Sequence, residues 1–206
     1  LVKRYDIVYG ALGIQPEEIN DYTEDNLRFI EEHIDDDKIL AVGEIGLDYH
    51  YECDKELQKE LFKKQLDIAK KHNKPVIIHS RDCITETYNI LKETNVKGIM
   101  HCYSGSVEMA KEFVKIGFLL GIGGVSTFKN ASKILDVIKN IPLEYIVLET
   151  DAPYLSPEPY RGKRNEPCNV SVILKKICEV KGIDYKDASD VTTRNVFRLF
   201  DKQLKL

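Results

Sequence analysis

Short apolar runs of strand length alternate with helical patterns along most of this chain, and this alternation restricts the fold more than any other feature. The runs are rich in Val, Ile and Leu and are apolar at nearly every position, which is typical of parallel strands buried on both faces. There are six of them, at residues 7–14, 38–45, 75–79, 98–101, 118–122 and 145–148. Strands that alternate with helices predict an α/β fold with a parallel sheet.

Helix-capping signals support the same interpretation. Asp54 and Ser106 each precede an amphipathic stretch, so we expect both to be N-caps, and Gly117 is expected to end the second helix. After Asp151 the pattern changes to a loop rich in Pro and Gly, and terminal helices are expected from about Asn169 onward.

Length and composition fit one globular domain that spans residues 1–206. The chain is 43% hydrophobic, which is enough for an ordinary core. No apolar run approaches the ~20 residues that a membrane helix needs, and the first residues contain no secretory signal, so we expect no membrane partner. The formal net charge of −4 does not fit a surface coated with positive charge for nucleic acid, although a local basic patch remains compatible with it.

Cysteine usage indicates a reducing compartment. The chain has five cysteines, an odd number, and no C-x-x-C pair. A disulfide framework and a thiolate zinc site are therefore not expected, and we predict a cytoplasmic location.

Four polar residues close apolar runs of the predicted sheet. Glu44, His79, His101 and Asp151 each fall at or just after the end of a different run. In a βα barrel the carboxyl ends of all strands meet at one rim, where the active site is built. We therefore expect these four side chains to lie together on that rim.

Imidazole nitrogens and carboxylate oxygens are ligands for divalent metal ions. Each residue alone has a simpler explanation, because a single His is more often only hydrogen-bonded and a single Asp or Glu often caps the next helix. Their joint placement favours a metal site. With two ions, such a site could activate water and stabilise the attacking and leaving oxygens of a phosphodiester.

Five segments of the chain resemble motifs of the TatD family, in the same order and with the same spacing. These segments are AVGEIGLDY at 41–49, KPVIIHSR at 74–81, HCYSG at 101–105, LETDAPYL at 148–155 and RGKRNEP at 161–167. The resemblance implies a TIM (β/α)8 barrel of the amidohydrolase-like kind and a metal-dependent hydrolase. Characterised relatives are described as deoxyribonucleases, often 3′–5′ exonucleases.

The resemblance also implies roles for the four strand-end residues. Glu44 corresponds to a carboxylate that bridges two ions, and His79 and His101 correspond to ligands of one ion. Asp151 corresponds to a further ligand and to the base that activates water. The expected cofactors are one or two divalent ions, either Mg, Zn or Mn.

Two departures from the family pattern have consequences. The family begins with an H-x-H strand that supplies two metal ligands, and this chain contains no H-x-H. Gln15 stands where the family's G-x-H-P segment has its histidine, so a proton-transfer role at this position is in doubt. Gln can still donate a hydrogen bond, and Gln15 is therefore a candidate substrate contact. Six strands where the barrel needs eight suggest that the first two βα units are missing and that this chain alone is inactive.

Basic residues near the predicted rim are candidate contacts for phosphate. Arg161, Lys163 and Arg164 follow the run that precedes Asp151, and Arg81 lies two residues after His79. Without the resemblance, a solubilising loop explains the first three equally well. With it, binding of DNA is favoured, as a single strand or a strand end.

Three functions therefore remain. The first is a metal-dependent nuclease that acts on DNA. The second is a hydrolase for a small ester, amide or nucleotide, because the same site could polarise many electrophiles. The third is a catalytically inactive remnant without enough metal ligands. The sequence does not predict the oligomeric state.

Overall fold

The computed structural model of the chain describes residues 1–200 and has an α/β fold in which strands and helices alternate. The strands are β1 (Gly10–Leu12), β2 (Ile39–Asp48), β3 (Val76–Arg81), β4 (Gly98–Met100), β5 (Phe118–Ile122) and β6 (Ile146–Leu148). The α-helices are α1 (Glu24–His33), α2 (Lys55–Lys71), α3 (Ile84–Leu91), α4 (Val107–Lys115), α5 (Ser132–Asn140), α6 (Val170–Lys181) and α7 (Tyr185–Phe200). The strand order follows the chain, from β1 to β6. The chain divides into two compact units, and the single domain expected over 1–206 stays a prediction.

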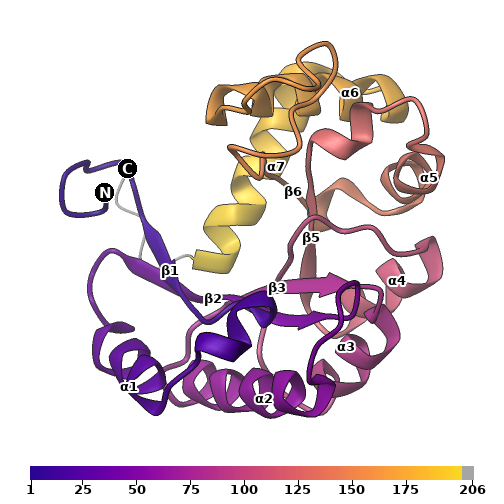
Figure 1. The fold of residues 1–206 in the computed structure, drawn as a ribbon. Helices are drawn as coiled ribbons and strands as arrows, with labels where there is room; N and C mark the ends of the chain where they lie inside the picture. Colours follow the sequence, from indigo (N-terminus) through magenta and orange to yellow (C-terminus); the bar gives the residue numbers. More distant parts are fainter. Residues whose placement is uncertain (201–206) are drawn as a thin grey trace. The chain divides into compact units, whose positions relative to one another are not determined.

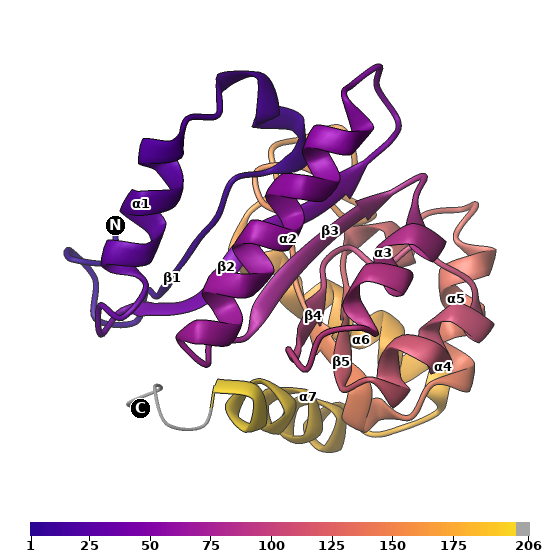
Figure 2. The same cartoon turned by 90° about the horizontal axis from the view of Figure 1, so that it is seen from below.

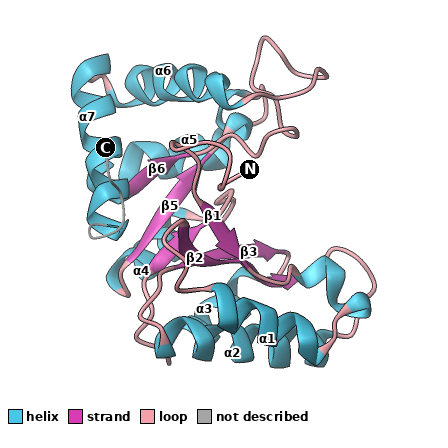
Figure 3. Ribbon diagram, turned by 90° about the vertical axis from the view of Figure 1, so that its left-hand side faces the viewer, coloured by secondary structure: helices cyan, strands magenta, loops and turns pink. Residues whose placement is uncertain are grey.

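The first unit is formed mainly by Leu1–Ile99. Its strands β1, β2 and β3 are parallel neighbours, and α1, α2 and α3 lie on one face of them (Figures 2 and 3). All but one of the ten residues of β2 are buried, as the continuous apolar run predicted.

Helix α2 shows how the sequence sets the local structure of this unit. Asp54 caps it as predicted, since its carboxylate accepts hydrogen bonds from the backbone of Glu56 and Leu57. Leu61 and Phe62 are each only 1% exposed and pack toward the sheet. Burial of each such side chain stabilises the fold by about 1.5–3 kcal/mol.

The second unit is formed by Met100–Arg198. Strands β5 and β6 are parallel, with helices α4 to α7 around them (Figure 1). Phe113 and Phe118 are fully buried and meet edge to face, with ring centroids 6.2 Å apart. Ser106 caps α4 as predicted, by accepting a hydrogen bond from the backbone of Met109.

The structure corrects the predicted ends of two strands. Residues 7–9 are not in a strand, since β1 begins at Gly10. Strand β2 continues past Glu44 to Asp48, and the register between β2 and β3 shifts between Val42 and Ile45. Glu44 therefore lies at a bulge inside the strand and not at its end, and a bulge of this kind re-aims a side chain.

The other strand-end predictions differ less. His79 lies inside β3, two residues before its last residue Arg81. His101 directly follows β4, and Asp151 lies three residues after the end of β6. Among residues 1–200, no helix combines the length and apolar character that crossing a membrane requires.

Candidate metal centre

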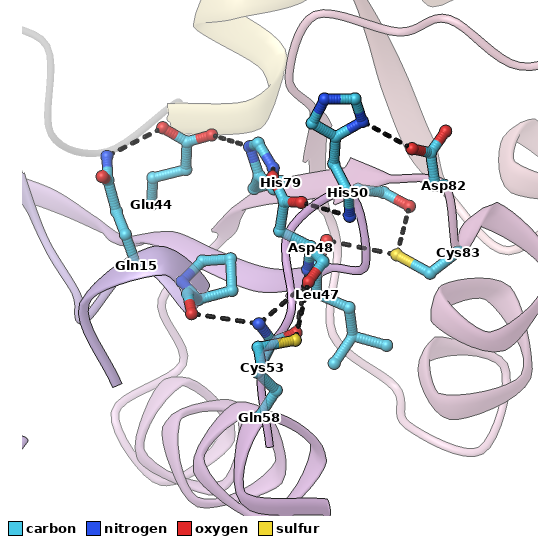
Figure 4. A network of polar contacts seen from close by, with 12 residues as sticks. Gln15, Glu44, Leu47, Asp48, His50, Cys53, Gln58, His79, Asp82 and Cys83 are labelled. Carbon is cyan, nitrogen blue, oxygen red and sulfur yellow. Dashed lines mark hydrogen bonds and ion pairs between the residues drawn. The ribbon is translucent and has the colours of Figure 1, made fainter. Parts of the chain in front are cut away.

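A chain of polar contacts runs across β2 and β3 in the first unit. The Nε2 atom of Gln15 donates a hydrogen bond to Glu44 Oε2 at 3.2 Å. The other carboxylate oxygen of Glu44 lies 3.1 Å from His79 Nδ1, and His79 Nε2 lies 2.7 Å from Asp48 Oδ2. Figure 4 shows Glu44 and Asp48 on the two sides of the His79 ring.

Asp48 is held in place by the surrounding protein. Its side chain is 2% exposed, and its second carboxylate oxygen accepts a hydrogen bond from the backbone of His50 at 2.8 Å. Gln58 of α2 bonds to both its backbone N–H and its backbone carbonyl, at 2.9 Å each. The carboxylate that faces His79 Nε2 is therefore a fixed part of the β2–α2 junction.

Close approach of two backbones sets the position of His79 relative to β2. Gly46 has a φ of +144°, and a Cβ atom built on it would lie 2.0 Å from the carbonyl oxygen of His79. Only glycine satisfies both conditions without a shift of the backbone. The glycine thus lets β3 lie against β2 where Glu44 and Asp48 reach the imidazole.

The second unit contains a comparable group around His101. His101 Nδ1 lies 2.8 Å from Glu149 Oε2, and its Nε2 lies 3.4 Å from Asp151 Oδ1. The other oxygen of Glu149 accepts a hydrogen bond from the backbone of Cys102 at 2.6 Å. A Cβ atom at Gly121 would lie 2.4 Å from the Glu149 carboxylate, so the absence of a side chain there makes room for it.

Both groups follow the same plan. One ring nitrogen faces a carboxylate that a backbone N–H also holds, which is Asp48 for His79 and Glu149 for His101. The other nitrogen faces a carboxylate predicted as a metal ligand, which is Glu44 or Asp151. Histidines that bind metals commonly donate their second N–H to a carboxylate in this way, so the donors of both groups fit divalent metal ions.

Ligand atoms of three residues converge in each unit. Such atoms of His101, Cys102 and Asp151 lie within 4.8 Å of one another, and so do those of Glu17, Asp48 and His79. The first set contains two of the predicted ligands, and the second contains only His79. Glu44 still reaches His79 directly, at 3.1 Å.

The chain matches the family model described as "TatD related DNase" over residues 1–201. It belongs to the TatD family. It is 44% identical to the Bacillus subtilis protein YabD over 97% of this chain and 80% of YabD, and 36% identical to YcfH of Escherichia coli over 97% of this chain and 76% of YcfH. Both relatives are named uncharacterised metal-dependent hydrolases.

A crystal structure of the TatD homologue YjjV from Escherichia coli K12 has the same fold. It superposes with a TM-score of 0.92, at 32% identity, over 98% of this chain and 80% of YjjV. This likeness confirms the predicted α/β fold of the barrel type. The chain is thus a TatD-family metal-dependent hydrolase.

Carboxylates around the two histidines of this TatD chain control their protonation. Burial alone would lower the pKa of both imidazoles. For His79, hydrogen bonds with Glu44 and Asp48 outweigh burial and raise the pKa. For His101, hydrogen bonds with Asp151, Cys102 and Glu149 raise it as well. A metal ion that binds either ring takes the place of this proton.

The Cys102 thiol also lies in this environment. Burial raises its pKa to about 12. Burial thus disfavours the thiolate form of Cys102 when no metal ion is bound.

The predicted substrate contacts are distributed over both units. Gln15 is bonded to Glu44, and the Arg81 guanidinium lies 5.4 Å from the ring centroid of Tyr51. Arg161, Lys163 and Arg164 are exposed on the loop that follows β6. Their contacts with substrate stay predictions.

Sequence reasoning missed Asp48 and Glu149, although a signal for both was present. Asp48 lies four residues after Glu44 on the same strand, and Glu149 lies two residues before Asp151. Even spacing along an extended strand places side chains on the same side, which applies to Asp48, whereas for Glu149 the signal is only its closeness in sequence, since Asp151 lies outside β6 with a φ of +56°. Carboxylates at such positions were therefore candidates to support the predicted ligands.

Proposed function

We propose that the full-length TatD-family protein hydrolyses phosphodiester bonds of DNA and acts as a 3′–5′ exonuclease on single-stranded ends. The observation that carries the proposal is the arrangement of the two histidines. Each is fixed by one carboxylate and turned toward another, which is how proteins prepare imidazole for a metal ion. The DNase description of the family model supports the choice of DNA.

We assign the metal ligands as Glu44 and His79 in the first unit and His101 and Asp151 in the second. A divalent ion bound by such ligands would supply Lewis acidity toward the phosphoryl group and toward water. Asp151 accepts the proton of the attacking water. Gln15 holds the second oxygen of Glu44, which fixes the direction of that carboxylate.

A hydrolase for a small ester, amide or nucleotide is the alternative, because the relatives are named only as metal-dependent hydrolases. The basic loop after β6 favours a polyanionic substrate. For a nuclease the rate of hydrolysis should depend on the length of the DNA substrate, whereas for a small-molecule hydrolase it should not.

The decisive experiment follows the cleavage of a 5′-labelled single-stranded oligonucleotide by the natural full-length polypeptide. We expect shortening from the 3′ end in the presence of Mg²⁺, Mn²⁺ or Zn²⁺ and none in chelator. Glu44→Gln should nearly abolish turnover, because it removes negative charge that holds the metal. Glu52→Gln, an exposed carboxylate outside both groups, is the matched control and should retain activity. Full activity of Glu44→Gln in chelator would contradict the mechanism.

A further inference from the structure

The loop after β6, residues 153–167, is held firmly although most of its side chains are exposed. The side-chain nitrogen of Asn165 donates hydrogen bonds to the carbonyls of Thr150 and Tyr154, at 2.6 and 2.7 Å. Asn165 is 2% exposed, and Ser156 donates to the carbonyl of Lys163 across the loop at 2.6 Å. These hydrogen bonds therefore restrict the backbone that carries the exposed side chains of the loop.

Aromatic and basic side chains share the exposed surface of this loop. Tyr154 is 71% exposed and Tyr160 is 43% exposed. The four residues from Arg161 to Arg164 include three cations and no carboxylate. In residues 1–200 no carboxylate forms an ion pair with these cations, whereas many other cations of the chain are paired.

The Arg161 guanidinium has a defined position. It lies 4.2 Å from the centroid of the Phe128 ring, within the range of a cation–π contact. A contact of this kind leaves N–H groups of the guanidinium available for an anion. The loop also carries Glu158 and Glu166, so its surplus of positive charge is small and concentrated at 161–164.

Tyr154 stands at a fixed and short distance from Asp151. The backbone N–H of Tyr154 donates to the carbonyl of Asp151 at 2.8 Å. A turn of this type keeps its first and fourth Cα atoms within about 7 Å. The Tyr154 side chain can therefore reach a nucleotide whose phosphate lies at Asp151.

We propose that Tyr154 is a stacking platform for a base of a single-stranded nucleic acid, while Arg161 and Lys163 hold the phosphates beside it. The inference rests on the proposed function and adds the way in which its substrate is bound. Tyr154 and these cations lie on the same hydrogen-bonded loop, and proteins bind single strands without a sequence preference by combining exposed aromatic rings with cations. Since every base has a π-face, such a site requires bases free of a duplex but not a particular sequence.

The test measures binding in chelator, so that the probe stays intact. The probes are two labelled oligo-dT strands of about ten nucleotides, a length within the usual site sizes of single-strand-binding proteins. One is complete, and the other lacks the bases at its 3′ end. The complete strand should bind the wild-type protein about 5- to 150-fold more tightly than the abasic one.

Substitutions separate stacking from the other contacts. Tyr154→Leu should lower the affinity for the complete strand by a similar factor and leave the affinity for the abasic strand unchanged. Tyr154→Phe should bind both strands like the wild type. Tyr185→Leu, an exposed tyrosine of α7, is the control for a general effect of removing a surface ring. Arg161→Ala with Lys163→Ala should lower the slope of log affinity against log salt by about 0.7 for each phosphate that the protein no longer binds, while Tyr154→Leu should leave the slope unchanged.

Equal affinity of the wild type for the two strands would overturn the inference, as would an equal loss with both strands in Tyr154→Leu. Complete displacement of both strands by polyglutamate at matched charge would identify the loop as a general polyanion surface instead. The hydrolysis assay decides the proposed function separately. Cleavage without base-dependent binding would leave the proposed function standing, and base-dependent binding without cleavage would leave only the stacking platform.

Discussion

The two candidate metal-binding histidines use opposite ring nitrogens toward their supporting carboxylates. His79 presents Nε2 to Asp48, and His101 presents Nδ1 to Glu149. Each of these carboxylates accepts the N–H of one ring nitrogen and so fixes the tautomer of the neutral imidazole. The other ring nitrogen faces Glu44 or Asp151, and its lone pair would be available to a metal ion that displaces its proton. Without such a carboxylate, part of the free energy of metal binding would be needed to orient the imidazole.

Asp48→Asn should weaken metal binding by about 10- to 100-fold, the usual loss when a carboxylate behind a metal-binding histidine is changed. The amide can still accept one hydrogen bond, but it no longer carries the charge that makes the imidazole a stronger ligand. Isothermal titration with Zn²⁺ or Mn²⁺ measures the change.

Asp82→Asn is the matched control for this substitution. Asp82 also faces a histidine, with its carboxylate 3.0 Å from His50 Nδ1, but the pair is exposed and lies outside both candidate groups. Its metal affinity should stay at the wild-type value. Equal affinities for Asp48→Asn and the wild type would show that Asp48 serves only the fold.

The sequence identified the candidate metal ligands, but it could not predict their surroundings. The apolar runs located Glu44 near a strand end, whereas the bulge that carries it depends on how β2 pairs with β3. Likewise, no local sequence pattern predicts that Gln58, on the following helix, forms hydrogen bonds with the backbone of Asp48. Such contacts depend on packing between elements, which periodicity does not describe.

At the scale of elements, caps and buried strands were the most predictable features. Asp54 and Ser106 cap their helices because the physical requirement is local, namely the unpaired N–H groups of the first turn. Residues 7–9 looked like a strand because they are apolar, but a strand also needs a partner, and pairing with β2 starts only at Gly10.

A contact between Tyr49 and Glu86 connects the segment that follows β2 to α3. The Tyr49 hydroxyl donates to the Glu86 carboxylate at 2.7 Å, and this bond, together with Lys59, lowers the pKa of Glu86. A lowered pKa in the folded state gives a stabilising contribution that is present above the ordinary value of 4.5 and is lost as the pH falls toward the folded-state value.

Tyr49→Phe should therefore flatten the acid side of the stability profile. In urea unfolding between about pH 6 and pH 3, the wild type should lose more stability than the variant, because the variant has less of this contribution to lose. Tyr51→Phe removes a hydroxyl from the exposed tyrosine two residues later and should keep the wild-type profile. Parallel profiles for Tyr49→Phe and the wild type would mean that Glu86 is not coupled to Tyr49 in solution.

At the scale of the whole molecule, the candidate ligands are divided equally between two compact units. Glu44 and His79 belong to the first unit, and His101 and Asp151 belong to the second. Each unit has its own buried core, with Phe62 and Ile78 in one and Phe113 and Phe118 in the other. Each pair of candidate ligands therefore lies in a unit with a core of its own.

Stabilisation by metal tests whether the histidine of each unit binds an ion. A ligand that binds only the native state at 100 times its Kd stabilises the fold by about 2.7 kcal/mol. His79→Asn and His101→Asn should each reduce this stabilisation, because each variant removes one candidate ligand. The measurement is the shift in Tm on addition of Zn²⁺ to the natural full-length polypeptide, for each variant relative to the same variant in chelator. That reference cancels the effect of each substitution on the fold itself. A shift equal to that of the wild type would show that the substituted histidine does not bind the metal, and it would leave only a hydrogen-bonding role with its carboxylates.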